Sequence, residues 1–85
     1  MTRLAVIGAG SMGAQIAQQA ALHGVDVALQ DKDAAQLQKA VDSNRGHLQR
    51  RVEKGRLTQF DFESALRRVR TATDLADAVQ VFRTA

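Results

Sequence analysis

Three glycines spaced as Gly-x-Gly-x-x-Gly are the feature of this 85-residue chain that most constrains its fold. They are Gly8, Gly10 and Gly13. An apolar run at residues 3–8 leads into them, and a stretch with helical spacing follows at residues 11–23. The first glycine permits a tight turn out of a strand, the second lets a pyrophosphate reach the backbone, and the third lets the helix lie close to the sheet. The pattern predicts a dinucleotide-binding turn, and its alternative is an ordinary strand-to-helix turn.

The hydrophobic pattern along the chain predicts strands and helices in alternation. The run at residues 3–8 is continuously apolar, which is typical of a parallel strand buried on both faces. The other predicted elements are a helix at 11–23, a strand at 25–30, a helix from 33 to about 54, a helix at 59–68, a strand at 69–72 and a brief helical turn at 73–78. This order predicts an α/β fold: a partial Rossmann fold, in which the first mononucleotide-binding half of a doubly wound parallel sheet carries a two-helix insertion.

Apolar side chains at helical spacing predict which helix faces are buried. In the first helix, Met12, Ile16 and Ala20 recur one turn apart, with Ala17 and Ala21 beside them. The apolar stripe of the long second helix consists of Leu37, Val41, Leu48 and Val52. Asp33 and Thr58 stand where side-chain caps would begin the second and third helices.

An acidic residue after the second predicted strand supports the dinucleotide-binding interpretation. Asp31 lies 21 positions after Gly10, close to the spacing of about 20 at which such folds place the acid that binds the ribose. Its carboxylate would accept hydrogen bonds from the ribose hydroxyls and repel a 2′-phosphate, which favours NAD over NADP. Asp33 is a competing acid, but its position favours capping a helix. The predicted cofactor contacts are Gly8, Ala9, Gly10, Ser11, Met12, Gly13 and Asp31.

The chain is basic, with a net charge of +3 and a pI near 10.2, which raises nucleic acid as a possible partner. The densest basic stretches, at residues 45–56 and 67–70, contain no aromatic residue that could stack on bases. This favours solvated helix faces, with contact to an anionic small molecule as the alternative. We expect no nucleic-acid partner.

Several other classes of protein are excluded by composition. The chain has no cysteine, so it can form neither a disulfide nor a thiolate metal site. His23 and His47 have no carboxylate or second histidine at a convincing spacing, so we expect no metal and no catalytic residue. No stretch approaches the roughly 20 apolar residues of a membrane span, and the glycines interrupt the N-terminal apolar run. We therefore expect a cytoplasmic protein without a membrane contact.

Five parts of the sequence match a known family. They are Leu4–Gln18, Gly24, Asp31, Lys54–Thr58 and Thr71–Leu75. Across residues 3–79 the chain resembles the 3-hydroxyacyl-CoA dehydrogenase family, including its bacterial 3-hydroxybutyryl-CoA members, and two helices between the second and third strands are typical of that family. The resemblance implies that the three glycines and Asp31 contact NAD. It also implies that Lys54 lies near the acyl-CoA tail, where its ammonium group could meet a phosphate.

The resemblance further implies a reaction, the oxidation of 3-hydroxyacyl-CoA to 3-oxoacyl-CoA in fatty acid metabolism. In family members the catalytic histidine, its acidic partner and the helical domain that forms the dimer lie further along the chain. We therefore expect residues 1–85 to form an incomplete dinucleotide-binding domain that is inactive alone. The alternative is a non-catalytic, truncated module that binds a nucleotide or a partner protein. Dehydrogenases of the 3-hydroxyisobutyrate and phosphogluconate type share the turn, but often carry a basic residue where this chain has Asp31.

Overall fold

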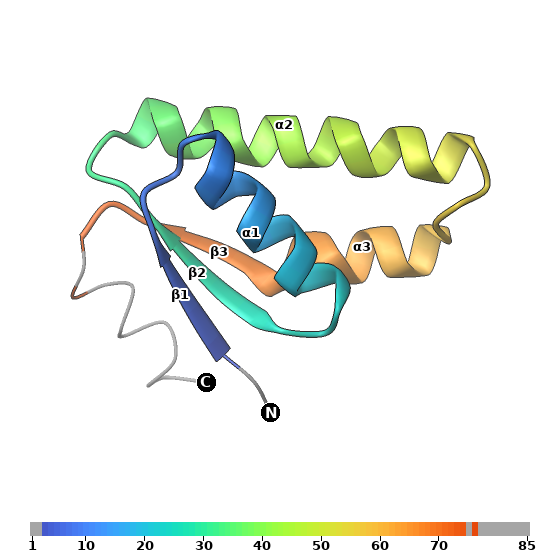
Figure 1. Cartoon of the computed structure of the whole chain (residues 1–85), viewed down its shortest axis with the longest axis horizontal. Helices are drawn as coiled ribbons and strands as arrows, with labels where there is room; N and C mark the ends of the chain where they lie inside the picture. The colour runs from blue at the N-terminus through green and yellow to red at the C-terminus, as the bar shows by residue number, and fades with distance from the viewer. Residues whose placement is uncertain (1–2, 75, 77–85) are drawn as a thin grey trace.

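The computed structural model describes residues 3–74 and residue 76, and these contain a parallel sheet of three short strands (Figure 1). The strands are β1 (Arg3–Ile7), β2 (Asp26–Gln30) and β3 (Val69–Ala72), in the order β1-β2-β3. In the register, Val6 lies opposite Leu29, and Leu29 lies opposite Thr71. Both pairings are parallel, as the continuous apolar run predicted. The burial on both faces that the same run predicted is wrong, because only Val6 of β1 is buried and Ile7 is 61% exposed.

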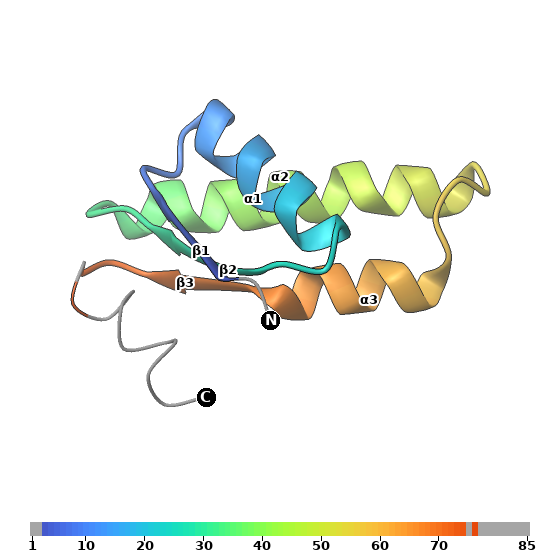
Figure 2. The ribbon, with the colours of Figure 1, turned by 60° about the horizontal axis from the view of Figure 1, so that its bottom comes forward.

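The described helices are α1 (Ser11–Leu22), α2 (Ala34–Glu53) and α3 (Gln59–Arg68). α1 connects β1 to β2, and α2 followed by α3 connects β2 to β3, so the predicted order of elements is confirmed. α1 and α2 lie on the same side of the sheet (Figure 2). Both connections are crossovers between parallel strands, and both step in the same direction across the sheet. Because such crossovers have the same handedness, their helices lie on the same side of the sheet. Residues 75, 77 and 78 of the helical turn predicted at 73–78 lie outside the described residues. No helix within residues 3–74 is both long and apolar enough to cross a membrane.

The starts of α2 and α3 are capped as the sequence predicted. Asp33 Oδ1 accepts a hydrogen bond from the Ala35 N–H at 2.9 Å, and Thr58 Oγ1 accepts one from the Asp61 N–H at 3.0 Å. α1 differs, because its cap residue is Gly10, which has no side chain to offer. The first N–H groups of α1 are thus left for another partner.

The core between the sheet, α1 and α2 contains small residues of α1. Ala14 and Ala17 pack with Val27, Leu29 and neighbouring residues of α2. A second cluster, made of Ala21, Leu48, Phe62 and Ala65, joins the three helices. Alanine on this face lets α1 lie close to both the sheet and α2.

The apolar residues noted in the first helix divide between two faces. Met12 and Ile16 are 75% and 45% exposed, whereas Ala17 and Ala21 beside them are buried, so the longer side chains do not face this core. Alanine occupies this interface because α1 lies so close to the sheet and to α2 that longer side chains do not fit between them. The longer side chains lie on the outer side of α1.

Two polar contacts hold the helices to one another. The buried Asn44 side chain donates from Nδ2 to the Ala14 carbonyl at 3.1 Å, which links α2 to α1. Arg68 donates from Nη1 to the Ala21 carbonyl at 2.8 Å, which links α3 to the last turn of α1. α1 is therefore fixed on both flanks, and its N-terminal end has a defined position relative to the sheet.

Candidate functional site

The glycine turn lies between the carboxyl end of β1 and the first turn of α1. Gly8 has a φ of +96°, in the left-handed region that favours glycine, and its N–H donates to the Gln30 carbonyl at 2.6 Å. This bond extends the pairing of β1 with β2 by one residue. The helix follows at once, since the Ala14 N–H donates to the Gly10 carbonyl at 2.9 Å. The chain thus passes from strand to helix in a few residues.

The first turn of α1 offers backbone N–H groups to a ligand. Because Gly10 provides no cap, the N–H groups of Ser11, Met12 and Gly13 have no partner within the helix. A Cβ built on Gly10 would have no protein atom within 4 Å, so the approach to these groups is open. Uncapped N–H groups at a helix start are a common binding site for phosphate oxygens.

Gly13 is needed for packing. A Cβ at this position would overlap the carbonyl oxygen of Gly8 and lie 3.5 Å from Cγ1 of Val6. α1 therefore crosses the end of β1 at backbone contact distance, which is the close approach that a third glycine predicts.

Asp31 directly follows β2, and its carboxylate contacts the glycine turn. Oδ2 accepts a hydrogen bond from the Ala9 N–H at 2.9 Å, and Oδ1 accepts one from the Asp33 N–H at 2.9 Å. The Ala9 N–H, followed by the Asp33 N–H, stabilises the charged form and lowers the pKa of Asp31 below its ordinary value of 3.8, against a smaller opposing effect of desolvation. The structure therefore places an anionic carboxylate beside the turn, although 22 residues separate Asp31 from Ala9 in the sequence.

A polar hollow of about 230 Å³ lies between the turn and α2. It is lined by Ala9, Gly10, Ser11, Ala14, Gln36, Lys39, Ala40 and Ser43. One ammonium group and two hydroxyls therefore lie near the uncapped N–H groups, and they add positive charge and hydrogen-bonding capacity to this end of α1.

Lys54 is the C-terminal cap residue of α2, at the opposite end of this helix from Asp33. It lines a hollow of about 400 Å³ together with Gln15, Gln18, Gln19, His47, Arg50 and Arg51. Three cationic side chains thus share one hollow with three amides of α1. Such a surface suits an anionic, hydrogen-bonding ligand.

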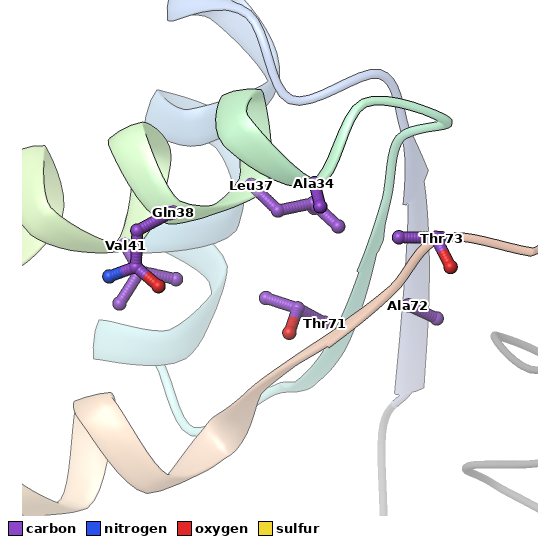
Figure 3. Close-up of a pocket in the computed structure, with 7 residues that line it drawn as sticks. All are labelled: Ala34, Leu37, Gln38, Val41, Thr71, Ala72 and Thr73. Atoms are coloured by element: carbon purple, nitrogen blue, oxygen red, sulfur yellow. The ribbon is translucent and has the colours of Figure 1, made fainter.

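A third hollow, of about 450 Å³, lies between the first half of α2 and β3 (Figure 3). It is lined by Ala34, Leu37, Gln38, Val41, Thr71, Ala72 and Thr73, and the side chain of Thr71 points toward α2. The lining contains no charged side chain, so this hollow holds neither an acid, a base nor a cation for an anionic ligand.

The two histidines lie apart from any proton-transfer arrangement. His23 Nδ1 is 2.7 Å from the Gln19 carbonyl, and because a carbonyl only accepts, the ring must carry its proton on Nδ1. Within the described residues, no hydrogen bond or ion pair joins His23 or His47 to a carboxylate. That part of the chain also contains no group of three His, Asp or Glu residues that could hold a metal ion.

Sequence reasoning missed Gln18, a polar residue on the alanine face of α1. Its side chain is only 7% exposed, and Oε1 has no hydrogen-bond partner within the described structure. The signal was present in the spacing, because Gln18 follows Ala14 by four residues and precedes Ala21 by three. A glutamine on such a face lies between two packed helices.

Both the sequence and the fold of the chain match known proteins. The model of a family described as "3-hydroxyacyl-CoA dehydrogenase, NAD binding domain" matches residues 3–82. The chain is 44% identical over 72 residues to 3-hydroxyadipyl-CoA dehydrogenase of Escherichia coli (strain K12), covering 85% of this chain and 15% of that protein. It is 42% identical over 86 residues to 3-hydroxybutyryl-CoA dehydrogenase of Bradyrhizobium diazoefficiens, covering 98% and 29%.

A solved structure agrees with these matches. The crystal structure of 3-hydroxybutyryl-CoA dehydrogenase from Escherichia coli K12 superposes with a TM-score of 0.87 at 42% identity, covering 89% of this chain and 16% of that one. The chain thus spans between 15% and 29% of the length of these relatives. The Rossmann-type fold predicted from the sequence is confirmed.

The contact between Gly13 and Gly8 predicts opposite effects of alanine at two helical glycines. Gly13→Ala should lower the free energy of unfolding by roughly 1–3 kcal/mol, because overlap with backbone outweighs a gain in helix propensity of about 1 kcal/mol. Gly46→Ala is the matched control, since its Cβ would come no closer than 3.7 Å to Arg50 Nη2, and it should gain about 0.5–1 kcal/mol. Urea unfolding followed by circular dichroism measures both. Equal effects of the two substitutions would contradict this account of Gly13.

Proposed function

The chain belongs to the 3-hydroxyacyl-CoA dehydrogenase family, whose NAD-binding domain it matches over residues 3–82, and we propose that it binds NAD through the glycine turn and Asp31. The observation that carries this proposal is their juxtaposition: an anionic carboxylate is hydrogen-bonded to the turn that leads into an uncapped, open helix start. The N–H groups of Ser11, Met12 and Gly13 would hold the pyrophosphate, and Asp31 would accept hydrogen bonds from the adenosine ribose.

NAD itself would supply the hydride acceptor when bound, and the residues of this chain would orient it. The substrate that we propose is a 3-hydroxyacyl-CoA, oxidised to the 3-oxoacyl-CoA, in keeping with the names of the relatives. Within the described residues, neither histidine is hydrogen-bonded or ion-paired to a carboxylate, so we assign the removal of the hydroxyl proton to groups outside these residues. The proposal also includes a role in fatty acid metabolism, a cytoplasmic location and dimerisation through a further domain.

The basic hollow at the end of α2 is the proposed contact for the phosphates of coenzyme A. Lys54 and Arg51 line it with the amides of α1, so charge and hydrogen-bond donors are both available. The sequence pointed to Lys54 alone, whereas the structure brings further cations to the same hollow. An alternative role for Lys54, charge compensation at the end of α2, would need no ligand.

The position of Asp31 predicts a preference between nucleotides. NAD should bind at least about tenfold more tightly than NADP, because the carboxylate would face the added 2′-phosphate. Isothermal titration calorimetry with both cofactors measures this, with Asp33→Asn as a control that keeps the helix cap and should keep the preference. Equal affinities for NAD and NADP would refute the role of Asp31.

Gly10→Val should abolish NAD binding, because its side chain would keep the pyrophosphate away from the backbone, and it should retain the circular dichroism spectrum.

The basic hollow predicts an effect of charge on coenzyme A binding. Lys54→Glu should weaken coenzyme A by roughly five- to tenfold at low ionic strength and by less at high salt, because surface charges are screened. Arg45→Glu is a matched control on the exposed surface of α2, outside the lining of the hollow. An identical loss in both variants would show that only the net charge matters.

The isolated 85-residue chain should not reduce NAD with 3-hydroxybutyryl-CoA, because neither histidine is placed to act as a general base. Such a base typically contributes about 10²- to 10⁴-fold to rate. The measurement is the absorbance of NADH at high protein concentration. Steady turnover that disappears in His23→Ala or His47→Ala would show that this chain is itself the enzyme, whereas NAD binding without turnover fits a cofactor-binding part or a non-catalytic module.

A further inference from the structure

We propose that Asp31 has a second role, in which its carboxylate holds the glycine turn in the shape that receives the pyrophosphate. This inference rests on the proposed function and deepens it. In that role Asp31 is a positioning residue for the phosphates as well as a contact for the ribose, and the group through which it acts is the Ala9 N–H.

The carboxylate is well placed to hold the turn because its own position is fixed. The Asp31 N–H donates to the Ala72 carbonyl at 3.2 Å, which anchors the residue to β3. Oδ1 accepts from the Asp33 N–H, so the side chain is held at a second point, and Oδ2 is directed at the Ala9 N–H. A rigid end of β2 thereby reaches across to the turn.

The turn needs such a contact, because its glycines have few side-chain interactions to restrain them. A Cβ at Gly8 or Gly10 would meet no protein atom within 4 Å, so this part of the backbone is open on its outer side. Ala9 lies between them, with its side chain only 3% exposed in the core and its N–H on Asp31. Ala9 therefore holds the turn through its buried side chain and through the bond from its N–H to Asp31, next to the bond from the Gly8 N–H to the Gln30 carbonyl.

In this arrangement, some backbone N–H groups of the site bind Asp31 and the others remain available to the phosphates. The Ala9 N–H is used by Asp31, which leaves the N–H groups of Ser11, Met12 and Gly13 for phosphate oxygens. The carboxylate can still bind the ribose, because its two oxygens have about four acceptor positions and the backbone uses two of them. A substitution of Asp31 intended to admit a 2′-phosphate would therefore also loosen the turn.

The two roles are separable with ADP and 2′,3′-dideoxy-ADP, since the second ligand lacks both ribose hydroxyls that the carboxylate could bind. Asp31→Ala should weaken 2′,3′-dideoxy-ADP by roughly fivefold or more, through loss of a positioned turn. The sign is diagnostic, because removing a negative charge near a diphosphate would by itself improve binding. Asp33→Ala is the matched control: it has the same change of charge and loses a backbone contact, to Ala35, that is not in the turn. It should change the affinity by less than about twofold.

Amide hydrogen exchange tests the contact without any ligand. The Ala9 N–H should exchange roughly tenfold or more faster in Asp31→Ala than in the parent, while the Gly24 N–H, which donates to the Ala21 carbonyl, is unchanged. Asp31→Asn keeps one acceptor oxygen and should recover part of both effects, and it decides the question if Asp31→Ala does not fold.

The outcomes separate this inference from the proposed function. If the parent binds neither ADP nor NAD, the proposed function fails, and Ala9 exchange alone decides the role of Asp31 in the turn. If Asp31→Ala weakens ADP but leaves 2′,3′-dideoxy-ADP unchanged or tighter, Asp31 contacts only the ribose and the inference is wrong. Equal Ala9 exchange in parent and variant overturns it as well.

Discussion

The close approach of α1 to the carboxyl end of β1 is the constraint on which the rest of the structure depends. It is possible only because Gly13 has no side chain where the Gly8 carbonyl passes. From this contact follow the alanine face of α1, the short distance between α1 and the sheet, and the exposure of the longer apolar side chains on the outer face. The uncapped start of α1 lies at the carboxyl edge of the sheet for the same reason.

Much of the fold could be predicted from the sequence because its determinants are local. The glycine spacing, the capping residues Asp33 and Thr58, and the continuous apolar run each act within a few residues, and the elements that they predict are confirmed. The exposure of Met12 could not be predicted in this way. Periodicity identifies an apolar face, but only the closeness of packing decides whether alanine or a longer side chain occupies the interface.

The sequence predicted which residues belong to the candidate site better than it predicted the contacts between them. Asp31 follows from its distance after the glycines, and the structure brings it to the turn. The bond from its carboxylate to the Ala9 N–H has no sequence signal, because it depends on the angle at which two strands end. The hollow at Lys54 could not be predicted for the same reason. Arg50, Arg51 and Lys54 follow one another along α2 at helical spacing, but they line a hollow only because α1 packs beside them. Long-range geometry therefore accounts for what the sequence left open.

The contact between Arg68 and the last turn of α1 has an electrostatic consequence for the opposite end of that helix. Aligned peptide dipoles give a helix a partial positive charge at its start and a partial negative charge at its end. At the end of α1 the guanidinium of Arg68 binds the Ala21 carbonyl, and the His23 ring binds the Gln19 carbonyl, so the negative pole is compensated within the protein. The positive pole, at Gly10, has no capping side chain. α1 therefore presents a positive pole that no side chain caps, beside the Asp31 carboxylate, and α3 contributes to that field from the far end of the helix.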